Sequence, residues 1–329
     1  MKEYLEYLFE HKTLTRERAK GLLVNIAEGS YNGSQLASFL TVFIMRSITV
    51  EELSGFRDAL LEICVKVDLS DFETIDLCGT GGDGKDTFNI STLSSFVTAG
   101  AGVKVAKHGN YGVSSSCGSS NVIQYIGHEF TDDPDKLKTQ IDKAGICFLH
   151  APLFHPAMKN IAPTRKEMGV KTFFNMLGPM VNPSFPKNQV VGVFSLELAR
   201  KYAYLYQNSE KRYSIIHALD GYDEISLTGK FKVISNNGEQ LLSPASLGLE
   251  QVKAEDLYGG ASVEEAGKIF MEILAGNGSK TQNEVVAANA GMAIKCMHPE
   301  KTIEESIGMA KESIMSGSAL NCLKTLLAT

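Results

Sequence analysis

The residues of this chain best suited to chemistry lie in a glycine-rich stretch, residues 76–84, that begins in an apolar run. Four glycines within positions 79–84 release the backbone from the usual steric limits, and a helical pattern begins near Ser91. A strand, a glycine-rich turn and a hydroxyl-rich helix start direct N–H groups, a helix dipole and hydroxyls at one point, which is typical of a phosphate-binding site. On this motif alone, a tight turn with an Asn or Ser N-cap is equally open.

Two acidic features favour a metal ion near that site. Asp83 lies inside the glycine-rich stretch, where a carboxylate suits a metal ion or a ribose hydroxyl better than a bare phosphate. Asp223 and Glu224 follow the apolar run 213–217, and adjacent carboxylates just past a strand suit Mg²⁺, which bridges to phosphate oxygens. Such a pair is by itself usually a solvated turn, so the metal site depends on the phosphate-binding loops beside it.

A second predicted anion-binding loop, residues 107–120, follows the next apolar run. It contains one basic side chain, Lys107, glycines at 109, 112 and 118, and five serines, and a helix begins at Gly118-Ser119. The alternative is a serine-rich surface loop. The position of this loop, one strand along from the first site, favours the binding function.

A third group of loops, residues 150–159, 163–166 and 175–179, combines histidines, prolines and apolar side chains with one arginine, Arg165. This set suits a carboxylate on an aromatic ring, because Arg can bind a carboxylate through two parallel hydrogen bonds. The alternative is stronger here, since a His or Arg beside prolines is more often a packing or capping residue.

The periodicity predicts a small helical domain plus a larger α/β domain with a mostly parallel central sheet flanked by helices. Residues 1 to about 66 show only helical spacing of apolar residues. From residue 74, short apolar runs at 75–78, 103–106, 146–149, 189–194 and 213–217 alternate with helical patterns, as in a parallel sheet. Ligands of such sheets gather at the carboxyl ends of the strands. We expect domains at 1–67, joined by part of 165–187, and at 70–329.

Local signals mark several element boundaries. Residues 230–242 contain a hairpin turn signal, and the rest of the chain reads as helical. Capping boxes are expected at Thr49/Glu52, Ser262/Glu265 and Thr302/Glu305. The N-terminal helices carry more apolar residues than so small a domain should need, namely Leu36, Phe39, Phe43, Leu53, Phe56 and Leu60. We therefore expect these helices to form a dimer interface, remote from the active sites.

The composition describes an ordinary globular protein, with 43% hydrophobic and 21% charged residues in 329. The net charge of −6 gives no electrostatic footprint for nucleic acid or an anionic membrane. Six cysteines without metal-ligand spacing predict reduced, mostly buried thiols in a cytoplasmic protein. Neither a signal peptide nor a run long enough to span a bilayer is expected.

Taken together, the motifs resemble the anthranilate phosphoribosyltransferases, which are phosphoribosyltransferases of the nucleoside-phosphorylase-like type. The resemblance covers nearly the whole chain, and its specificity lies in the joint order of the motifs, which span residues 79–83, 89–92, 107–110, 118–119, 151–158, 174–179 and 220–226. It implies transfer of the phosphoribosyl group from 5-phosphoribosyl diphosphate (PRPP) to anthranilate, giving N-(5-phosphoribosyl)anthranilate and pyrophosphate in L-tryptophan biosynthesis. It also implies Mg²⁺, two ions per subunit, and a homodimer joined through the helical domains.

The resemblance assigns site residues position by position. PRPP would be bound by Gly79, Gly82, Asp83, Thr87, Asn89, Ile90, Ser91, Thr92, Lys107, His108, Gly109, Asn110, Tyr111, Gly112, Val113, Ser114, Ser115 and Ser119. Anthranilate would be bound or approached by Gly79, Asn110, Arg165, His108, His155 and Pro179, and Mg²⁺ by Ser91, Asp223 and Glu224. Two positions depart from many relatives, since Tyr111 stands in place of Arg and Ser116 in place of Lys.

The implied chemistry needs positioning more than acid–base catalysis. Pyrophosphate leaves easily once Mg²⁺ neutralises it, and the ribose carbon develops oxocarbenium character. No side chain is therefore expected to act as a nucleophile or as a general acid or base. One alternative is a pyrimidine nucleoside phosphorylase of the same fold, against which the Asp223-Glu224 pair argues. Another is a relative that binds nucleic acid without catalysis, against which the acidic charge balance argues.

Overall fold

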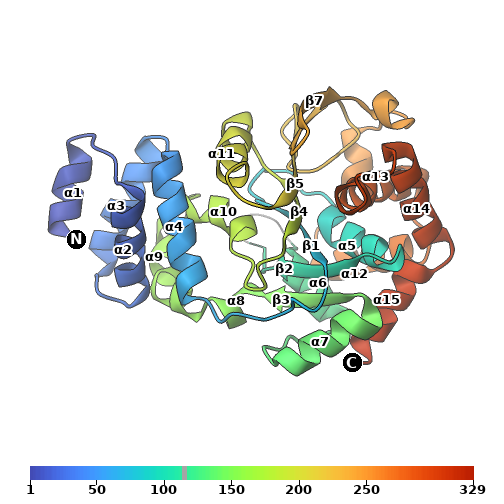
Figure 1. Cartoon of the computed structure of the whole chain (residues 1–329), viewed down its shortest axis with the longest axis horizontal. Coiled ribbons are helices and arrows are strands. Elements are labelled where there is room, and N and C mark those ends of the chain that lie inside the picture. Colours follow the sequence, from blue (N-terminus) through green and yellow to red (C-terminus); the bar gives the residue numbers. More distant parts are fainter. Residues whose placement is uncertain (113–116) are drawn as a thin grey trace. The chain divides into compact units, whose positions relative to one another are not determined.

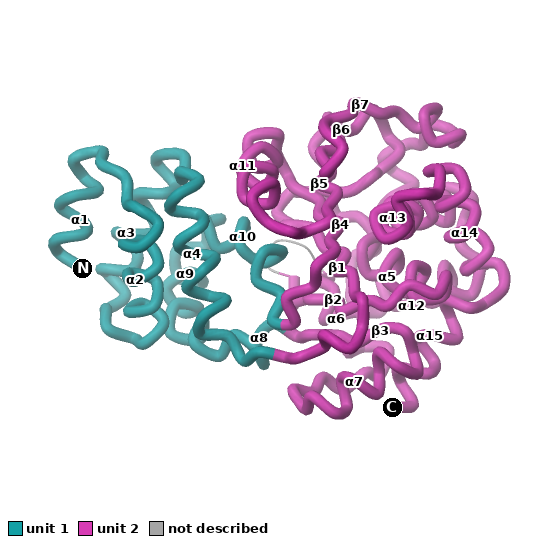
Figure 2. The backbone as a smooth tube through the Cα atoms, in the orientation of Figure 1, with its two compact units in different colours: residues 1–66, 151–183 teal, residues 67–150, 184–329 magenta. Residues whose placement is uncertain are grey.

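The computed structural model describes residues 1–112 and 117–329, and these form two compact units (Figure 2). The first unit contains residues 1–66 and 151–183, and the second contains residues 67–150 and 184–329. The domain limits expected from the sequence, 1–67 and 70–329, remain a prediction. In the described part of the chain, no helix is long and apolar enough to cross a membrane.

The first unit is entirely helical. Its elements are α1 (Lys2–Phe9), α2 (Arg16–Ala27), α3 (Gly33–Met45), α4 (Val50–Ile63), α8 (Ala151–Phe154), η1 (Pro156–Asn160), α9 (Ala162–Met168), α10 (Phe174–Leu177) and η2 (Gly178–Met180). Four phenylalanine rings form its centre: Phe56 stacks on Phe173 with ring centroids 4.5 Å apart, and Phe39 and Phe43 meet both rings edge-on. The segment 151–183 therefore supplies part of the core around which α1–α4 pack.

This packing corrects one expectation. All six apolar residues that were counted as surplus surface are buried within the chain, and none is more than 7% exposed. Their number reflects a core shared with Phe173, so they are not surplus apolar surface, and a dimer interface on these helices stays a prediction.

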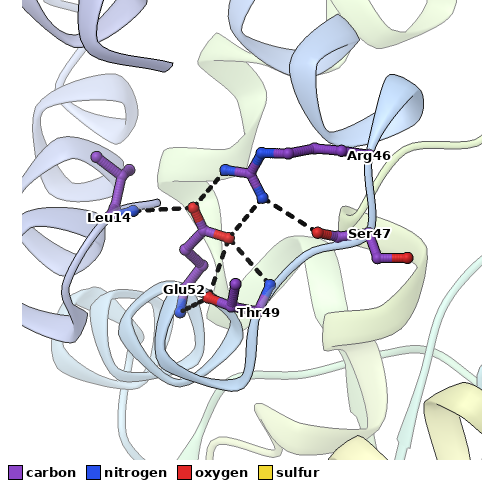
Figure 3. Close-up of polar contacts among 5 residues, drawn as sticks. All are labelled: Leu14, Arg46, Ser47, Thr49 and Glu52. Carbon is purple, nitrogen blue, oxygen red and sulfur yellow. Dashed lines mark hydrogen bonds and ion pairs between the residues drawn. The ribbon is translucent and has the colours of Figure 1, made fainter. Parts of the chain in front are cut away.

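A buried ionic network joins three segments of the helical unit (Figure 3). Glu52 is fully buried, and its carboxylate accepts two hydrogen bonds from the guanidinium of Arg46, at 2.6 and 2.9 Å. It also accepts from the backbone N–H groups of Leu14 and Thr49. Thr49 and Glu52 complete the predicted capping box, so one side chain both starts α4 and fixes the loops before α2 and after α3.

The second unit is an α/β layer structure around a seven-stranded sheet in the order β3-β2-β1-β4-β5-β6-β7 (Figure 1). Its strands are β1 (Thr74–Gly79), β2 (Lys104–Gly109), β3 (Ile146–His150), β4 (Asn188–Gly192), β5 (Arg212–Ala218), β6 (Phe231–Ser235) and β7 (Gly238–Leu242). The first five are parallel, and β6 and β7 add antiparallel to one edge. The expected mostly parallel sheet and hairpin are confirmed.

Helices cover the sheet and carry most of the core. They are α5 (Ile90–Gly100), α6 (Ser119–Tyr125), α7 (Pro134–Ala144), α11 (Leu196–Tyr206), α12 (Val263–Leu274), α13 (Lys280–Met297), α14 (Ile303–Met315) and α15 (Ser318–Leu327), with the short helices η3 (Pro244–Leu247) and η4 (Ala254–Leu257). Gly291 lets α13 approach α14 closely, since a Cβ there would lie 2.6 Å from Ile307.

The predicted helix caps are mostly confirmed. Thr302 and Glu305 form a complete capping box at the start of α14. At α12 only half of the box is present, because Ser262 accepts from Glu265 N–H while the Glu265 carboxylate accepts from the N–H of Ala261 instead. Gly260, in the left-handed region with a φ of 91°, turns the chain so that the N–H of Ala261 reaches this carboxylate.

Candidate active site

The predicted site loops of the second unit leave the same edge of the sheet. The last residue of β1, Gly79, pairs with Gly192 at the end of β4, and Gly109 at the end of β2 pairs with His150 at the end of β3. Because these strands are parallel, the loops that follow them begin side by side at their carboxyl ends. The loop after β5 carries Asp223 back onto this edge.

Asp223 is seated directly on the ends of β1 and β4. Its carboxylate accepts a 2.7 Å hydrogen bond from the N–H of Gly81. A Cβ at Gly79 would meet the same carboxylate, 3.0 Å from its Cγ, and a Cβ at Gly192 would meet the backbone carbonyl of Asp223. Both strand ends are therefore glycine because the chain at Asp223 passes too close for any side chain.

Glu224 is held by the segment that follows the glycine-rich turn in sequence. The hydroxyl of Thr87 donates to the Glu224 carboxylate at 2.8 Å. Asp223 is buried and Glu224 is partly exposed. The alternative reading of this pair as a solvated turn is thus wrong.

Acidic groups are concentrated here, and the nearby charge of Lys107 only partly offsets their effect on one another. Burial is the main cause that raises the pKa of Asp223 to about 7, and the charge of Asp83 adds to it. Burial and the charge of Asp223 together raise the pKa of Glu224 well above its usual value. A cation bound beside two such carboxylates would stabilise their ionised forms.

The donor set fits Mg²⁺ held jointly with phosphate oxygens. Two carboxylates offer hard oxygen ligands, the type that Mg²⁺ prefers. Within residues 1–112 and 117–329, no three or more His, Cys, Asp or Glu side chains form a group that could hold a metal ion by themselves. Among the same residues, no hydrogen bond links the Ser91 hydroxyl to either carboxylate, so its predicted part in metal binding stays a prediction.

The glycine-rich turn has the backbone freedom that its sequence predicts. Gly81, Gly82 and Gly84 all have φ values between 63° and 75°, in the left-handed region. Asp83 caps the turn by accepting from the N–H of Lys85. At the start of α5, Asn89 forms no capping bond and instead donates its side-chain amide to the carbonyl of Cys117. The alternative of an Asn-capped turn is therefore not what the structure shows.

Lys107 lies on β2 and is buried, although a position in the following loop was expected. Its side chain is 1% exposed, and its Nζ donates to the carbonyl of Leu77 at 2.7 Å. Burial lowers its pKa, while the charges of Asp76 and Glu224 act in the opposite direction. The positive charge thus lies beneath the site, between two strands. Asp76 is also fully buried and accepts from the N–H of His108, a role that the sequence analysis missed.

The second loop is closed at its base by Asn121, which was also missed. The N–H groups of Gly112 and Gly118 both donate to the Asn121 side-chain oxygen, at 2.9 and 3.0 Å. The carbonyl of Asn110 accepts from the hydroxyl of Ser119 at 3.2 Å. Of the predicted site residues, Val113, Ser114 and Ser115 lie outside the described residues, as does Ser116.

Tyr111 is held in a polar and aromatic cluster. Its ring meets His150 edge-on with centroids 4.8 Å apart, and its hydroxyl donates to Gln124 at 3.1 Å. His150 in turn lies 2.8 Å from the Ser120 hydroxyl and stacks on Phe130. Tyr111 therefore ties the start of this loop to α6 and to the end of β3.

Three further predicted residues belong to the helical unit. Arg165 on α9 lies over the ring of Phe174 at 5.1 Å and within 3.5 Å of the Asn175 side-chain oxygen. No ion pair of Arg165 is found in the described part of the chain, and burial lowers its pKa. His155 lies 2.9 Å from the carbonyl of Val181, and Pro179 begins the buried part of η2. An arginine without a carboxylate partner is suited to an anionic ligand.

Two family models match this chain over most of its length. Residues 2–64 match the helical bundle domain of a glycosyl transferase family, and residues 71–320 match its a/b domain. The division between the two models falls between α4 and β1.

Individual relatives and solved structures agree with these models. An anthranilate phosphoribosyltransferase from Flavobacterium psychrophilum is 62% identical over 99% of this chain and 98% of its own length. The crystal structure of anthranilate phosphoribosyltransferase (TrpD) from Thermus thermophilus matches with a TM-score of 0.91, 31% identity and 98% coverage of both chains. The Saccharomyces cerevisiae enzyme in complex with PRPP and Mg matches with a TM-score of 0.90 and 27% identity, over 99% of this chain and 96% of its own.

Proposed function

This chain belongs to the anthranilate phosphoribosyltransferase family, and from that premise we propose that it transfers the phosphoribosyl group of PRPP to anthranilate. It is then a pentosyltransferase whose products are N-(5-phosphoribosyl)anthranilate and pyrophosphate, in L-tryptophan biosynthesis. One observation carries the chemistry: two carboxylates with raised pKa values are built onto the glycine-rich turn through Gly81 and Thr87.

We propose Mg²⁺ as the cation that these carboxylates hold, because the yeast relative was solved with PRPP and Mg. Asp223 and Glu224, with Ser91, would be its protein ligands, and two ions per subunit remain the expectation. When bound, Mg²⁺ neutralises the diphosphate and makes pyrophosphate a better leaving group.

The residues of the second unit perform the rest of the PRPP chemistry by positioning. Backbone N–H groups of the glycine-rich turn and of the first turn of α5 would bind phosphate oxygens, apart from the N–H of Gly81, which donates to Asp223. Lys107 places a buried positive charge under the site, which lowers the cost of gathering carboxylates and phosphates there. We propose that the PRPP site comprises 79, 82–83, 87, 89–92, 107–115 and 119, as the family resemblance implies.

For anthranilate we propose Arg165 as the carboxylate partner and Asn110 as a second polar contact. Gly79, His108, His155 and Pro179 would shape the approach of the aromatic ring. No general base is required, because the aryl amine is weakly basic and loses its proton readily after the C–N bond forms. Asn110 already uses its side-chain oxygen to accept from the N–H of Tyr111, so its amide N–H groups are the ones that would face the substrate.

The proposal also covers the assembly, the domain limits and the cellular location of the protein. We propose a homodimer formed through the helical unit, but through side chains other than the six buried in its core. We propose domain limits at 1–67, with part of 165–187, and at 70–329. We also propose a cytoplasmic location, because the six cysteines are free thiols.

The test is a direct assay with purified protein. Anthranilate fluorescence should fall after PRPP and Mg²⁺ are added, with release of one pyrophosphate per anthranilate consumed. Unchanged fluorescence from folded protein at saturating Mg²⁺ would refute the proposal. Phosphate-dependent cleavage of a pyrimidine nucleoside would favour the phosphorylase alternative, and retention on heparin at moderate salt would favour nucleic-acid binding.

A further inference from the structure

A segment outside the predicted site loops holds the backbone of Thr87. Residues 254–260, here called the strap, contain η4 and run antiparallel to residues 86–88. The N–H of Phe88 donates to the carbonyl of Leu257 at 3.0 Å, and the N–H of Gly259 donates to the carbonyl of Asp86 at 2.8 Å. Thr87 pairs with Tyr258 between these two bonds.

The strap touches Thr87 too closely for any residue but glycine at 259. A Cβ on Gly259 would lie 2.5 Å from the Thr87 carbonyl oxygen and 2.7 Å from the backbone nitrogen of Phe88. Both are backbone atoms, so no flexible side chain can move aside. The strap itself is anchored, because Leu257 is 1% exposed and packs in the core of the second unit. A side chain at 259 must therefore displace the backbone around Thr87.

A displacement of Thr87 would also move Glu224, because the two side chains are hydrogen-bonded directly. The Thr87 hydroxyl donates to Glu224 at 2.8 Å, and this bond fixes the Glu224 carboxylate relative to the segment that the strap holds. We propose that the strap is a positioning element for the phosphoribosyl transfer, in which Gly259 sets Thr87 and Thr87 sets Glu224. This inference rests on the proposed function, which assigns Thr87 and Glu224 to the PRPP and Mg²⁺ site.

The first experiment compares Gly259→Ala with Gly308→Ala. Gly308 is exposed on α14 with no atom within 4 Å of its Cβ position, so the same chemical change there should leave kinetics unchanged. Gly259→Ala should raise the KM for PRPP and lower kcat/KM for PRPP by roughly 10- to 100-fold, because small misplacements of catalytic groups are costly. The KM for anthranilate should stay within a factor of about two, because the strap pairs with residues 86–88, which lie outside the proposed anthranilate site.

The second experiment asks whether Gly259 acts through Thr87. Thr87→Val removes the hydroxyl and keeps the shape, and Thr87→Ser keeps the hydroxyl. If the strap works through the Thr87–Glu224 bond, the double variant Gly259→Ala/Thr87→Val should lose about as much activity as the worse single variant. Thr87→Ser should retain most activity. Losses that multiply in the double variant would overturn the proposed coupling.

A binding measurement removes the dependence on turnover. Calorimetric titration of PRPP in the presence of Mg²⁺ should show weaker binding to Gly259→Ala than to Gly308→Ala, with equal Tm values within a few degrees. Should Gly259→Ala not fold, Leu257→Val loosens the strap at its anchor and should show a smaller loss of the same kind. Active wild-type protein with normal PRPP binding in the folded strap variant refutes this inference alone, whereas inactive wild-type protein refutes the proposed function.

Discussion

The carboxylate of Asp223 accepts a hydrogen bond from the N–H of Gly81, 142 positions earlier in the chain, at 2.7 Å. This contact joins the loop after β5 to the turn after β1. It places an acidic group on a glycine-rich turn, an arrangement that suits a cation held between the carboxylate and a phosphate. The same closeness makes the ends of β1 and β4 intolerant of side chains.

Gly79→Ala should therefore abolish most activity. The added methyl group would collide with the Asp223 carboxylate and push it away from Gly81. We expect kcat/KM to fall at least about 100-fold, because the reacting groups would be misplaced by close to an ångström. Gly21→Ala, at an exposed position of α2 with open space around it, is the matched control and should retain normal kinetics. Comparable activity in both variants would mean that this contact has no part in catalysis.

Asp223→Asn should lower kcat by a large factor, and raised Mg²⁺ or its replacement by Mn²⁺ should change the deficit. The asparagine keeps the shape and loses the charge, so it separates metal binding from packing. Glu224→Gln is expected to behave similarly. Steady-state rates over a range of Mg²⁺ concentrations test this, and normal turnover with normal Mg²⁺ dependence in both variants would contradict it.

The raised pKa of Asp223 also predicts a pH effect on stability without metal. The folded state binds this proton more tightly than the unfolded state, for which the pKa is near 4. Stability from this group is therefore full below about pH 4 and is lost as the pH rises toward about 7. In EDTA, the Tm of wild-type protein should fall more between pH 5 and pH 8 than that of Asp223→Asn. Equal falls in both proteins would show that Asp223 ionises normally.

Arg165→Ala should raise the KM for anthranilate and leave the affinity for PRPP nearly intact. Loss of a charge-assisted contact to a carboxylate costs roughly 1.5–3 kcal/mol, or about 10- to 150-fold in affinity. The control is Arg200→Ala, which removes an exposed arginine from α11. A variant that loses PRPP affinity first would show that Arg165 serves the other substrate.

Glu52→Gln should destabilise the protein at neutral pH. Arg46 and the N–H groups of Leu14 and Thr49 outweigh the effect of burial and lower the Glu52 pKa, so the carboxylate stabilises the fold. Its contribution, roughly 1.5–3 kcal/mol, is present above the unfolded pKa and is lost as the pH falls through the folded one. Urea unfolding at pH 7 and pH 3 measures this. Glu51→Gln, on the exposed neighbour, should cost no more than about 1 kcal/mol.

Much of the fold follows from local sequence patterns, and much of the site does not. Strands and helices were predicted because each periodicity is a property of neighbouring residues, and Thr49/Glu52 could be recognised as a capping box for the same reason. The burial of Asp223 could not be predicted in this way, because it depends on contact with Gly192, at the end of β4.

The other unpredicted features depend on where a side chain points or on contacts between residues far apart in the sequence. Lys107 was expected to act in its loop, but a strand residue points to one face or the other, and its Nζ lies against the carbonyl of Leu77. Asn121 was missed because its partners, Gly112 and Gly118, become neighbours only when the loop closes. Part of 165–187 was expected to join the helical domain, but Phe173 was not identified as its core residue, because it is far in sequence from Phe56.

The position of Phe173 has a consequence for how this protein is made. Ribosomes deliver α1–α4 first, then three strands of the sheet, and only afterwards the ring that stacks on Phe56. Until residue 173 emerges, the nascent helices expose an aromatic surface, which is the kind of surface that chaperones bind. A gene fragment that stops at residue 66 should therefore yield aggregated protein, whereas one that links 1–66 to 151–183 encodes the complete set of rings. The helical unit is compact in space, but its two segments are synthesised at different times.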